Sequence, residues 1–361
     1  MYNGPYQGGL VLSAPDFYLK MHNFFNRLIK RDSPLRPFAK PIGTDLRTLS
    51  RAFRPWKRLE AKPQCLFIEP TNICNSNCIF CAYQFQDRLR RGRGFMSPEL
   101  YKKALDGYER LGGHKWLYIC SLVGEPLLDP GIIEKIYRAK QRGFFVTIFT
   151  NGIMLNKVDA ARLLKSGIDE IVVSTAPFDE KSYISLCRNK SYKDVLEGTA
   201  RLLKERNLSD SRCIISIAFR SHISFKKIID LPDYKNLILP LLRDNEKRSV
   251  YECSRIKDFD NWGGQIRKKD LIGIMDLARP PLFKFRPCIR TFSVVVWYDG
   301  KVRGCDCRFA DTERDELYLG DLNKDPLEGI WRGKPMKDLR RKFSQGRLPK
   351  VCRSCTMYLA C

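Results

Sequence analysis

Residues Gln64 to Cys81 read QCLFIEPTNICNSNCIFC and join a short apolar run to three closely spaced cysteines. The run from Gln64 to Glu69 has the length and character of a buried strand. Cys74, Cys78 and Cys81 follow it as C-x3-C-x2-C, at the carboxyl end of the strand, where parallel α/β folds build their sites. Three thiolates hold a [4Fe-4S] cluster and leave its fourth iron open to another ligand. The loop adds neither a fourth cysteine nor a histidine, as a structural zinc site would need.

Further along the chain, short apolar runs alternate with longer amphipathic patterns, which predicts βα units around a parallel sheet. After the first strand we expect strands at residues 116–121, 145–150, 170–174 and 213–219, and helices at 97–111, 132–142 and 159–165. Ser97 and Pro98 are typical of a helix start. The later pattern predicts a hairpin over 292–297 and 301–303 that turns at Asp299-Gly300.

Composition and charge limit the location and the partners of the protein. The 361-residue chain contains 14 cysteines, no export signal and no apolar run of membrane-spanning length, so we expect a cytoplasmic protein whose cysteines serve as metal ligands or reactive thiols. Its formal net charge of +25 favours an anionic partner, such as a phosphorylated substrate, a nucleic acid, an anionic membrane surface or an acidic redox protein. Nucleic acid is the less favoured of these because no aromatic RNA-binding signature accompanies the charge.

Residues 1–60 form a basic extension with eleven Lys or Arg residues and several prolines. Within it, Phe17, Met21, Phe24 and Leu28 recur at helical spacing beside basic residues, which predicts an amphipathic helix. We expect this helix to dock on the folded core, and a peripheral membrane anchor is the alternative.

The cysteine triplet resembles the motif of the radical S-adenosylmethionine (SAM) superfamily, which places an aromatic residue where Phe80 precedes the last cysteine. Gly124-Glu125-Pro126 is similar to the family's GGEP element, with Val123 in place of the first glycine. The resemblance implies an α/β fold, a partial (β/α)6 TIM-like barrel over about residues 61–280. It also implies that SAM binds the open iron and is reductively cleaved to a 5′-deoxyadenosyl radical, which abstracts hydrogen from a substrate.

The same resemblance implies several residues that contact SAM. The Gly124–Pro126 element meets the SAM amino group through its backbone and its acid, and Asn151 closes the third strand as in family members. Ser174 is similar to a serine that contacts the SAM ribose, and Arg188 to an arginine whose bidentate fork pairs with the SAM carboxylate. In a chain this basic, an ordinary surface arginine is the alternative for Arg188. Cys187 is a candidate hydrogen-atom donor in an epimerisation, with a buried core thiol as the alternative.

Residues 281–361 are expected to form a small auxiliary-cluster domain, because their cysteines resemble the opening of the SPASM pattern. The spacing is Cys288, Gly300, Cys305 and then Cys352-x2-Cys355-x5-Cys361. The pattern's next cysteines have no counterpart here, so the resemblance implies one auxiliary [4Fe-4S] cluster, as in the shortened "twitch" version. We expect its ligands to be Cys288, Cys305, Cys352 and Cys355, with Cys307 and Cys361 as substitutes. A zinc ribbon with four cysteines is the alternative, which iron content decides.

These implications predict an enzyme, a radical SAM oxidoreductase. A single auxiliary cluster accepts an electron from a substrate radical, which favours oxidation or another redox-linked change of a small anionic, carbohydrate-like substrate. The first alternative is a maturase that modifies a ribosomally made peptide, as SPASM-type relatives often do. The second is a zinc-containing protein that binds nucleic acid through its positive charge.

Two loops are candidate contact sites. The basic loop after the cysteine triplet is expected to receive an acidic electron donor such as flavodoxin or ferredoxin, through Arg88, Arg90, Arg91 and Arg93. A substrate phosphate or a simply solvated run of charge is the alternative. Residues 260–265, DNWGGQ, combine polar groups and glycine around one indole, as a substrate-facing loop or a plain turn would. The sequence does not indicate an oligomeric state.

Overall fold

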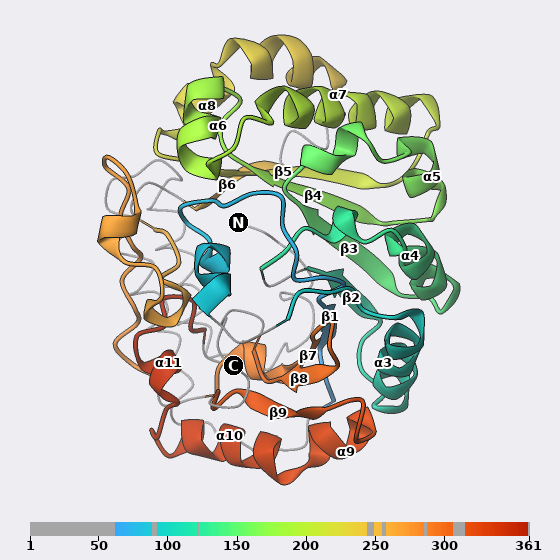
Figure 1. Cartoon of the computed structure of the whole chain (residues 1–361), viewed down its shortest axis with the longest axis vertical. Helices are drawn as coiled ribbons and strands as arrows, with labels where there is room; N and C mark the ends of the chain where they lie inside the picture. Colours follow the sequence, from blue (N-terminus) through green and yellow to red (C-terminus); the bar gives the residue numbers. More distant parts are fainter. Residues whose placement is uncertain are drawn as a thin grey trace, which may run out of the picture.

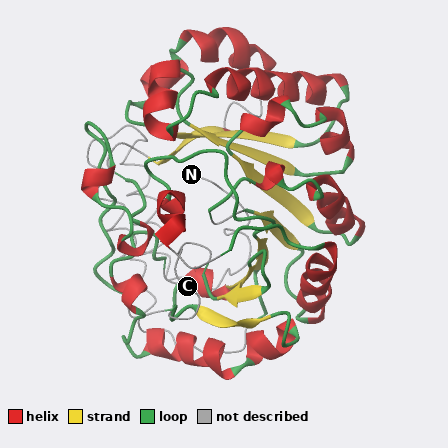
Figure 2. Ribbon diagram, viewed as in Figure 1, coloured by secondary structure: helices red, strands yellow, loops and turns green. Residues whose placement is uncertain are grey.

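The computed structural model of the protein describes residues 62–88, 92–120, 123–243, 249–254, 258–284, 287–305 and 315–359. Several predictions lie outside the described residues, namely the extension at 1–60 with its helix, Arg90, Arg91, Cys307, Cys361 and the side chain of Arg88. Figure 1 traces the chain, and Figure 2 shows helices arranged along the outer side of one curved sheet.

Six parallel strands form the larger part of this sheet. They are β1 (Cys65–Ile68), β2 (Trp116–Ile119), β3 (Phe145–Thr150), β4 (Glu170–Thr175), β5 (Ile214–Arg220) and β6 (Val250–Ser254). Each pairs in parallel with the next, which is the order that successive βα units produce. The first five lie within two residues of their predicted bounds, and β6 lies outside the predictions. The sheet begins at β6 and ends at β9 without closing, so the expected partial barrel is confirmed.

Helices connect these strands and cover one face of the sheet (Figure 1). They are α3 (Pro98–Arg110), α4 (Ile132–Gln141), α5 (Ala160–Lys165), α6 (Glu180–Cys187), α7 (Tyr192–Leu208) and α8 (Phe225–Ile229). In α3 the Ser97 hydroxyl accepts a hydrogen bond from the N–H of Leu100 at 3.1 Å, and Pro98 occupies the first turn. Leu100, Ala104 and Tyr108 are buried at helical spacing, so one side of α3 faces the core. Shorter 3-10 or π segments are η2 (Ala82–Arg88), η3 (Pro126–Leu128), η4 (Ile153–Asn156), η5 (Tyr234–Ile238), η6 (Leu239–Leu241), η8 (Trp262–Gly264), η9 (Lys268–Asp270) and η10 (Ile289–Phe292).

The two faces of the sheet differ in composition because side chains alternate along each strand. The face under the helices carries aliphatic residues such as Ile68 and Ile148, which are fully buried. The opposite, inner face is aromatic, and Phe67 stacks on Tyr118 with ring centres 4.8 Å apart. Cys81 packs against this inner cluster, so the aromatic face adjoins the cysteine triplet.

The chain next adds β7 (Ser293–Val296), β8 (Lys301–Arg303) and β9 (Tyr318–Asp321) to the same sheet. β7 runs parallel to β1, with Cys65 opposite Ser293 and Ile68 opposite Val296, whereas β8 and β9 are antiparallel. Gly300 turns the β7–β8 hairpin with a φ of 88°, which glycine adopts without strain. The predicted hairpin is present, and its pairing with β1 was not predicted. The domain boundary near residue 280 stays a prediction.

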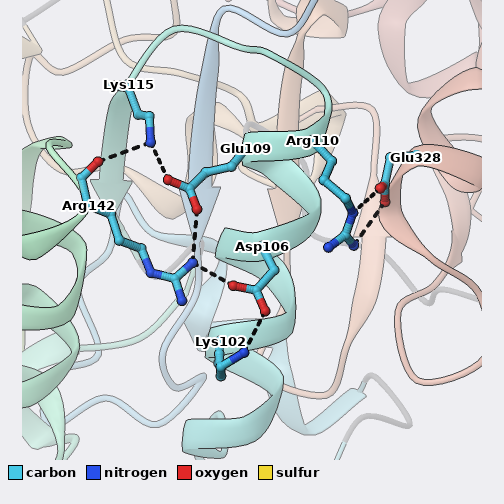
Figure 3. A network of polar contacts seen from close by, with 7 residues as sticks. All are labelled: Lys102, Asp106, Glu109, Arg110, Lys115, Arg142 and Glu328. Carbon is cyan, nitrogen blue, oxygen red and sulfur yellow. Dashed lines mark hydrogen bonds and ion pairs between the residues drawn. The ribbon is translucent and has the colours of Figure 1, made fainter.

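Helices α9 (Leu327–Arg332), α10 (Lys334–Ser344) and α11 (Lys350–Arg353) follow. α9 packs on α3 where Gly107 leaves room, since a Cβ there would lie 2.6 Å from the Cβ of Leu327. Figure 3 shows the ion pairs around this contact, with Arg110 of α3 against Glu328 of α9. Exposed ion pairs of this kind add little stability, so the contact between α3 and α9 depends more on the close packing at Gly107. None of the described helices combines the length with the apolar character that a membrane crossing requires.

Candidate active site

Cys74, Cys78 and Cys81 lie on one loop that follows β1, and short contacts fix its shape. The N–H of Cys81 donates to the carbonyl of Cys78 at 3.1 Å. The Tyr83 hydroxyl donates to the carbonyl of Cys74 at 3.1 Å and accepts from the N–H of the same residue at 3.2 Å. The N–H of Tyr83 donates to the Cys81 sulfur at 3.4 Å. Tyr83 therefore ties the first cysteine of the triplet to the last.

The electrostatics of the three thiols fit a bound cluster. Burial is the main cause that raises the pKa of Cys74, and burial also raises the pKa of Cys81 to about 12. Neighbouring thiols add to both shifts, because thiolates repel one another. Three thiolates here therefore need positive charge, which iron supplies in a [4Fe-4S] cluster. Among the described residues, no three His, Cys, Asp or Glu side chains converge on a single ion, and the thiolates of a cluster instead bind three different irons.

The C-terminal end of α6 is fastened to the cysteine loop. The Ser76 hydroxyl donates to the carbonyl of Cys187 at 3.0 Å and lies 3.2 Å from the Cys78 sulfur. The N–H of Ile79 donates to the carbonyl of Leu186 at 3.0 Å. The Cys187 thiol is buried and hydrogen-bonds to Cys78, which lowers the pKa of Cys78. Cys187 thus contacts an expected cluster ligand, and its role as a hydrogen donor stays a prediction.

Glu125 connects the loops that follow β1, β2 and β3. Its carboxylate accepts hydrogen bonds from the N–H of Leu127 at 3.0 Å, the hydroxyl of Thr150 at 2.7 Å and the N–H of Asn151 at 2.6 Å. Its own N–H donates to the carbonyl of Ile73 at 2.8 Å. The residue is 1% exposed, and this burial raises the pKa of Glu125 to about 7 despite the three donors. A carboxylate in this position gains stability from a cationic partner.

Asn151 brings the end of β3 to the first cysteine of the triplet. Its side-chain amide donates to the side-chain Oδ1 of Asn75 at 2.8 Å and lies 3.7 Å from the Cys74 sulfur. Gly124 is half-buried just before Glu125, and Pro126 begins η3. The structure therefore brings the glycine, acid and proline of this element together with Asn151 beside the triplet. That they contact SAM stays a prediction.

An arginine outside the predicted set lies next to the triplet. Arg220 ends β5, its Nε donates to the Ser174 hydroxyl at 3.2 Å, and its guanidinium lies 5.4 Å from the centre of the Phe80 ring. The pKa of Cys78 is lowered by the hydrogen bond from Cys187 and also by the charge of Arg220. The signal for Arg220 is its position, because it directly follows the fifth predicted strand at the edge that carries the other site residues.

Arg188 has a different environment. It is exposed at the C-cap of α6 and has a left-handed φ of 53°. Its role toward SAM stays a prediction.

The four expected auxiliary ligands come together in the C-terminal part of the chain. One cavity is lined by Cys288, Cys305, Cys352 and Cys355, which arrive from the start of η10, the end of β8 and the α11 turn. Burial raises the pKa of Cys288 to about 12, and the thiols of Cys305 and Cys355 contribute to the rise. Cys355 donates its N–H to the carbonyl of Cys352 at 3.3 Å. Four thiols in one cavity fit a fully ligated cluster.

Residues 260–265 connect the two cysteine sites. The indole N–H of Trp262 donates to the carbonyl of Phe80, the residue before the last cysteine of the triplet, at 3.0 Å. On the other side, the Asn261 amide donates to the carbonyl of Ser354, between two auxiliary cysteines, at 2.6 Å. Trp262 has a left-handed φ of 49°, which costs a non-glycine residue about 1–3 kcal/mol. The segment is therefore a strained bridge between the sites.

Comparison with known proteins identifies both parts of the chain. The family model of the radical SAM superfamily matches residues 68–223, and the model of an iron–sulfur cluster-binding domain, SPASM, matches residues 288–356. The chain therefore contains a radical SAM domain followed by a SPASM domain. Its cofactors are SAM, the [4Fe-4S] cluster that binds it, and an auxiliary cluster in the SPASM part. The second match supports iron over the zinc-ribbon alternative.

Two curated relatives and one solved structure show how far the likeness of this radical SAM protein extends. A tungsten-containing aldehyde ferredoxin oxidoreductase cofactor-modifying protein from Pyrococcus furiosus is 31% identical over 109 residues, 30% of this chain and 30% of the relative. PqqA peptide cyclase from Granulibacter bethesdensis is 28% identical over 146 residues, 40% of this chain and 38% of the relative. The chain thus spans about a third of the length of these relatives. Streptococcus suis SuiB bound to precursor peptide SuiA has a TM-score of 0.55 at 14% identity, over 94% of this chain and 81% of that one, which shows a shared fold.

Proposed function

We propose that this radical SAM enzyme modifies a side chain of a peptide. The proposal rests on the 146-residue stretch that is 28% identical to PqqA peptide cyclase, an enzyme named for its peptide substrate. The open sheet supports it, because an unclosed barrel does not enclose its substrate on all sides. These observations favour the peptide alternative over the small carbohydrate-like substrate of the first prediction.

The residues around the triplet are arranged to hold SAM. When bound on Cys74, Cys78 and Cys81, the cluster supplies the single electron that cleaves SAM. Glu125 has the charge to bind the SAM ammonium group, which would compensate for the burial of its carboxylate. Arg220 suits the SAM carboxylate because a guanidinium forms two parallel hydrogen bonds to such a group.

The expected reaction is a two-electron oxidation of the peptide. One hydrogen atom passes from a peptide C–H bond to the 5′-deoxyadenosyl radical and gives 5′-deoxyadenosine. Loss of one further electron and one proton from the peptide completes the oxidation. The four cysteines of the C-terminal cavity would hold the auxiliary cluster, which supplies an acceptor for that electron. The aromatic inner face with Phe67 and Tyr118 keeps water from the space beside Cys81.

A small anionic substrate is the second candidate. The net charge of +25 favours it, since an excess of positive charge attracts anionic ligands. The relative from Pyrococcus furiosus is named for modification of a cofactor, and a cofactor is a small molecule and not a peptide.

Deuterium transfer distinguishes the two candidates. The reconstituted protein is incubated anaerobically with SAM, dithionite and a deuterated cell extract divided into a peptide fraction and a fraction of small anionic metabolites. We expect the 5′-deoxyadenosine to gain deuterium from the peptide fraction. Deuterium gained from the small-molecule fraction alone would contradict the proposal. The Cys74→Ala variant controls for SAM cleavage that does not depend on the first cluster.

A further inference from the structure

Lys284 is a buried cation beside the auxiliary cavity. It is 7% exposed. Its ammonium donates to the carbonyls of Cys352 at 3.0 Å, Arg353 at 2.8 Å and Cys355 at 2.8 Å. The ammonium also lies 5.8 Å from the ring centre of Tyr358, which lines the cavity. One lysine therefore holds the turn that carries two of the four expected cluster ligands.

The three contacts stabilise both the turn and the lysine. α11 ends at Arg353, and carbonyls at and beyond a helix end lack partners from a following helical turn, although that of Cys352 also accepts the N–H of Cys355. A charged donor satisfies them with stronger hydrogen bonds than a neutral donor would. In return, a buried ammonium needs nearby negative charge, which carbonyl dipoles supply in part. A cluster with four thiolate ligands carries net negative charge and would supply more.

Other cations near the cavity have different surroundings. Arg303 donates to the carbonyl of Cys305 at 3.2 Å, but it forms a buried ion pair with Asp315, which balances its charge. Arg290 lines the cavity and is half-buried, so solvent screens its charge more strongly. Lys284 combines deep burial with direct contact to two ligand residues.

We propose that Lys284 is a positioning residue for the auxiliary cluster and that its charge raises the reduction potential of that cluster. The inference rests on the ligand assignment in the proposed function. Reduction adds one negative charge to the cluster, and a buried positive charge nearby stabilises it. With an effective dielectric constant of about 20, a unit charge close to the cluster shifts the reduction equilibrium on the order of tenfold. For one electron this equals about 59 mV. A cluster that accepts an electron more readily suits oxidation of a substrate radical.

The test is an anaerobic redox titration of the full chain, with each cluster followed by electron paramagnetic resonance. Lys284→Met and Lys284→Gln both remove the charge, and the second keeps a hydrogen-bond donor. We expect both to lower the equilibrium constant for reduction of the auxiliary cluster about tenfold, with that of the first cluster unchanged. Lys284→Arg keeps the charge and should retain most of the wild-type potential.

Lys350→Met is the matched control. Lys350 begins α11, the helix whose end Lys284 contacts, but it is exposed, so solvent screens its charge. Neutral Lys284 variants that keep all their iron and the wild-type potential would overturn the proposal. Loss of auxiliary iron from the neutral variants but not from Lys284→Arg supports it, whereas equal loss from Lys284→Arg contradicts it. A wild-type protein without auxiliary iron would overturn the ligand assignment itself, and iron analysis detects that before any variant is made.

Discussion

The two cysteine sites of this protein are built in opposite ways. The first triplet spans eight residues after β1, and Tyr83 closes it through contacts with Cys74 and Cys81. The auxiliary site draws its four cysteines from three separate segments, around Cys288, around Cys305 and in the α11 turn. One site is formed by local sequence, and the other is assembled by tertiary packing.

This difference indicates what each site depends on. The local loop keeps its shape while β1 and its hydrogen-bond partners are in place. The assembled cavity also needs the packing of β7, β8 and α11, which must offset the entropy of closing long chain segments. We therefore expect changes at the first site to act on SAM cleavage, and changes at the second to act on the fate of the substrate after cleavage.

The largest effect should come from the triplet. Replacement of Cys74, Cys78 or Cys81 by alanine removes one of three thiolates and should abolish SAM cleavage, measured as 5′-deoxyadenosine formed with dithionite. The iron of one cluster should be lost while the auxiliary iron stays. Cys213→Ala is the matched control, since Cys213 is a buried thiol just before β5. A triplet variant that still cleaves SAM would show that the first cluster is held elsewhere.

Removal of an auxiliary ligand should separate the two sites. Cys355→Ala should lose auxiliary iron and the modified product. It should change the rate of SAM cleavage by less than about tenfold, because sites without shared ligands behave nearly independently. The measurement is the ratio of 5′-deoxyadenosine to product. If Cys355→Ala stops SAM cleavage as fully as Cys74→Ala does, the two sites act as one unit and the comparison fails.

The two arginines should give the next largest effect. Arg220→Met should weaken SAM binding about 10- to 100-fold, the range for a lost hydrogen bond to a charged group. Arg188→Met changes an exposed residue and should alter binding little. Anaerobic calorimetry measures both affinities. A greater loss from Arg188→Met would restore the role that sequence resemblance predicts for it.

The smallest effect should come from the bridge between the sites. Trp262→Phe keeps an aromatic ring but loses the N–H that donates to Phe80, a change of about 1 kcal/mol. Hydrogen exchange in residues 74–83 should become about fivefold faster, with SAM cleavage nearly normal. Trp331→Phe, a buried change in α9, is the control. Unchanged exchange in Trp262→Phe would mean that the bridge does not link the sites mechanically.

Local sequence patterns predict most of the barrel. β3 is an apolar run that starts after a helix-ending glycine, and its predicted bounds of 145–150 agree with the structure. β6 escapes prediction because its residues, VYECS, mix apolar and polar types without a clear alternation. The pairing of β7 with β1 is also invisible locally, since partners such as Cys65 and Ser293 are 228 residues apart.

The candidate site is predictable to the extent that motifs mark it. The cysteine triplet and Glu125 are found from their spacing and resemblance, but the three donors to Glu125 come from the fold. Arg220 and Lys284 are missed because the residue type of a single cation carries no signal in a chain with 65 Lys and Arg residues, and only the position of Arg220 after the fifth predicted strand could have indicated it. Their contacts with Ser174 and with the auxiliary turn become visible when strand ends and loops are placed in space.

The pairing of β7 with β1 bears on any attempt to divide the protein. A chain shortened to end near residue 280 would lack β7, and one edge of β1 would lose its hydrogen-bonding neighbour. The residues of that strand, including Leu66 and Phe67, are apolar and buried. An uncovered apolar strand edge pairs readily with other chains. We therefore expect the isolated barrel to aggregate through the strand that leads into its own first cluster.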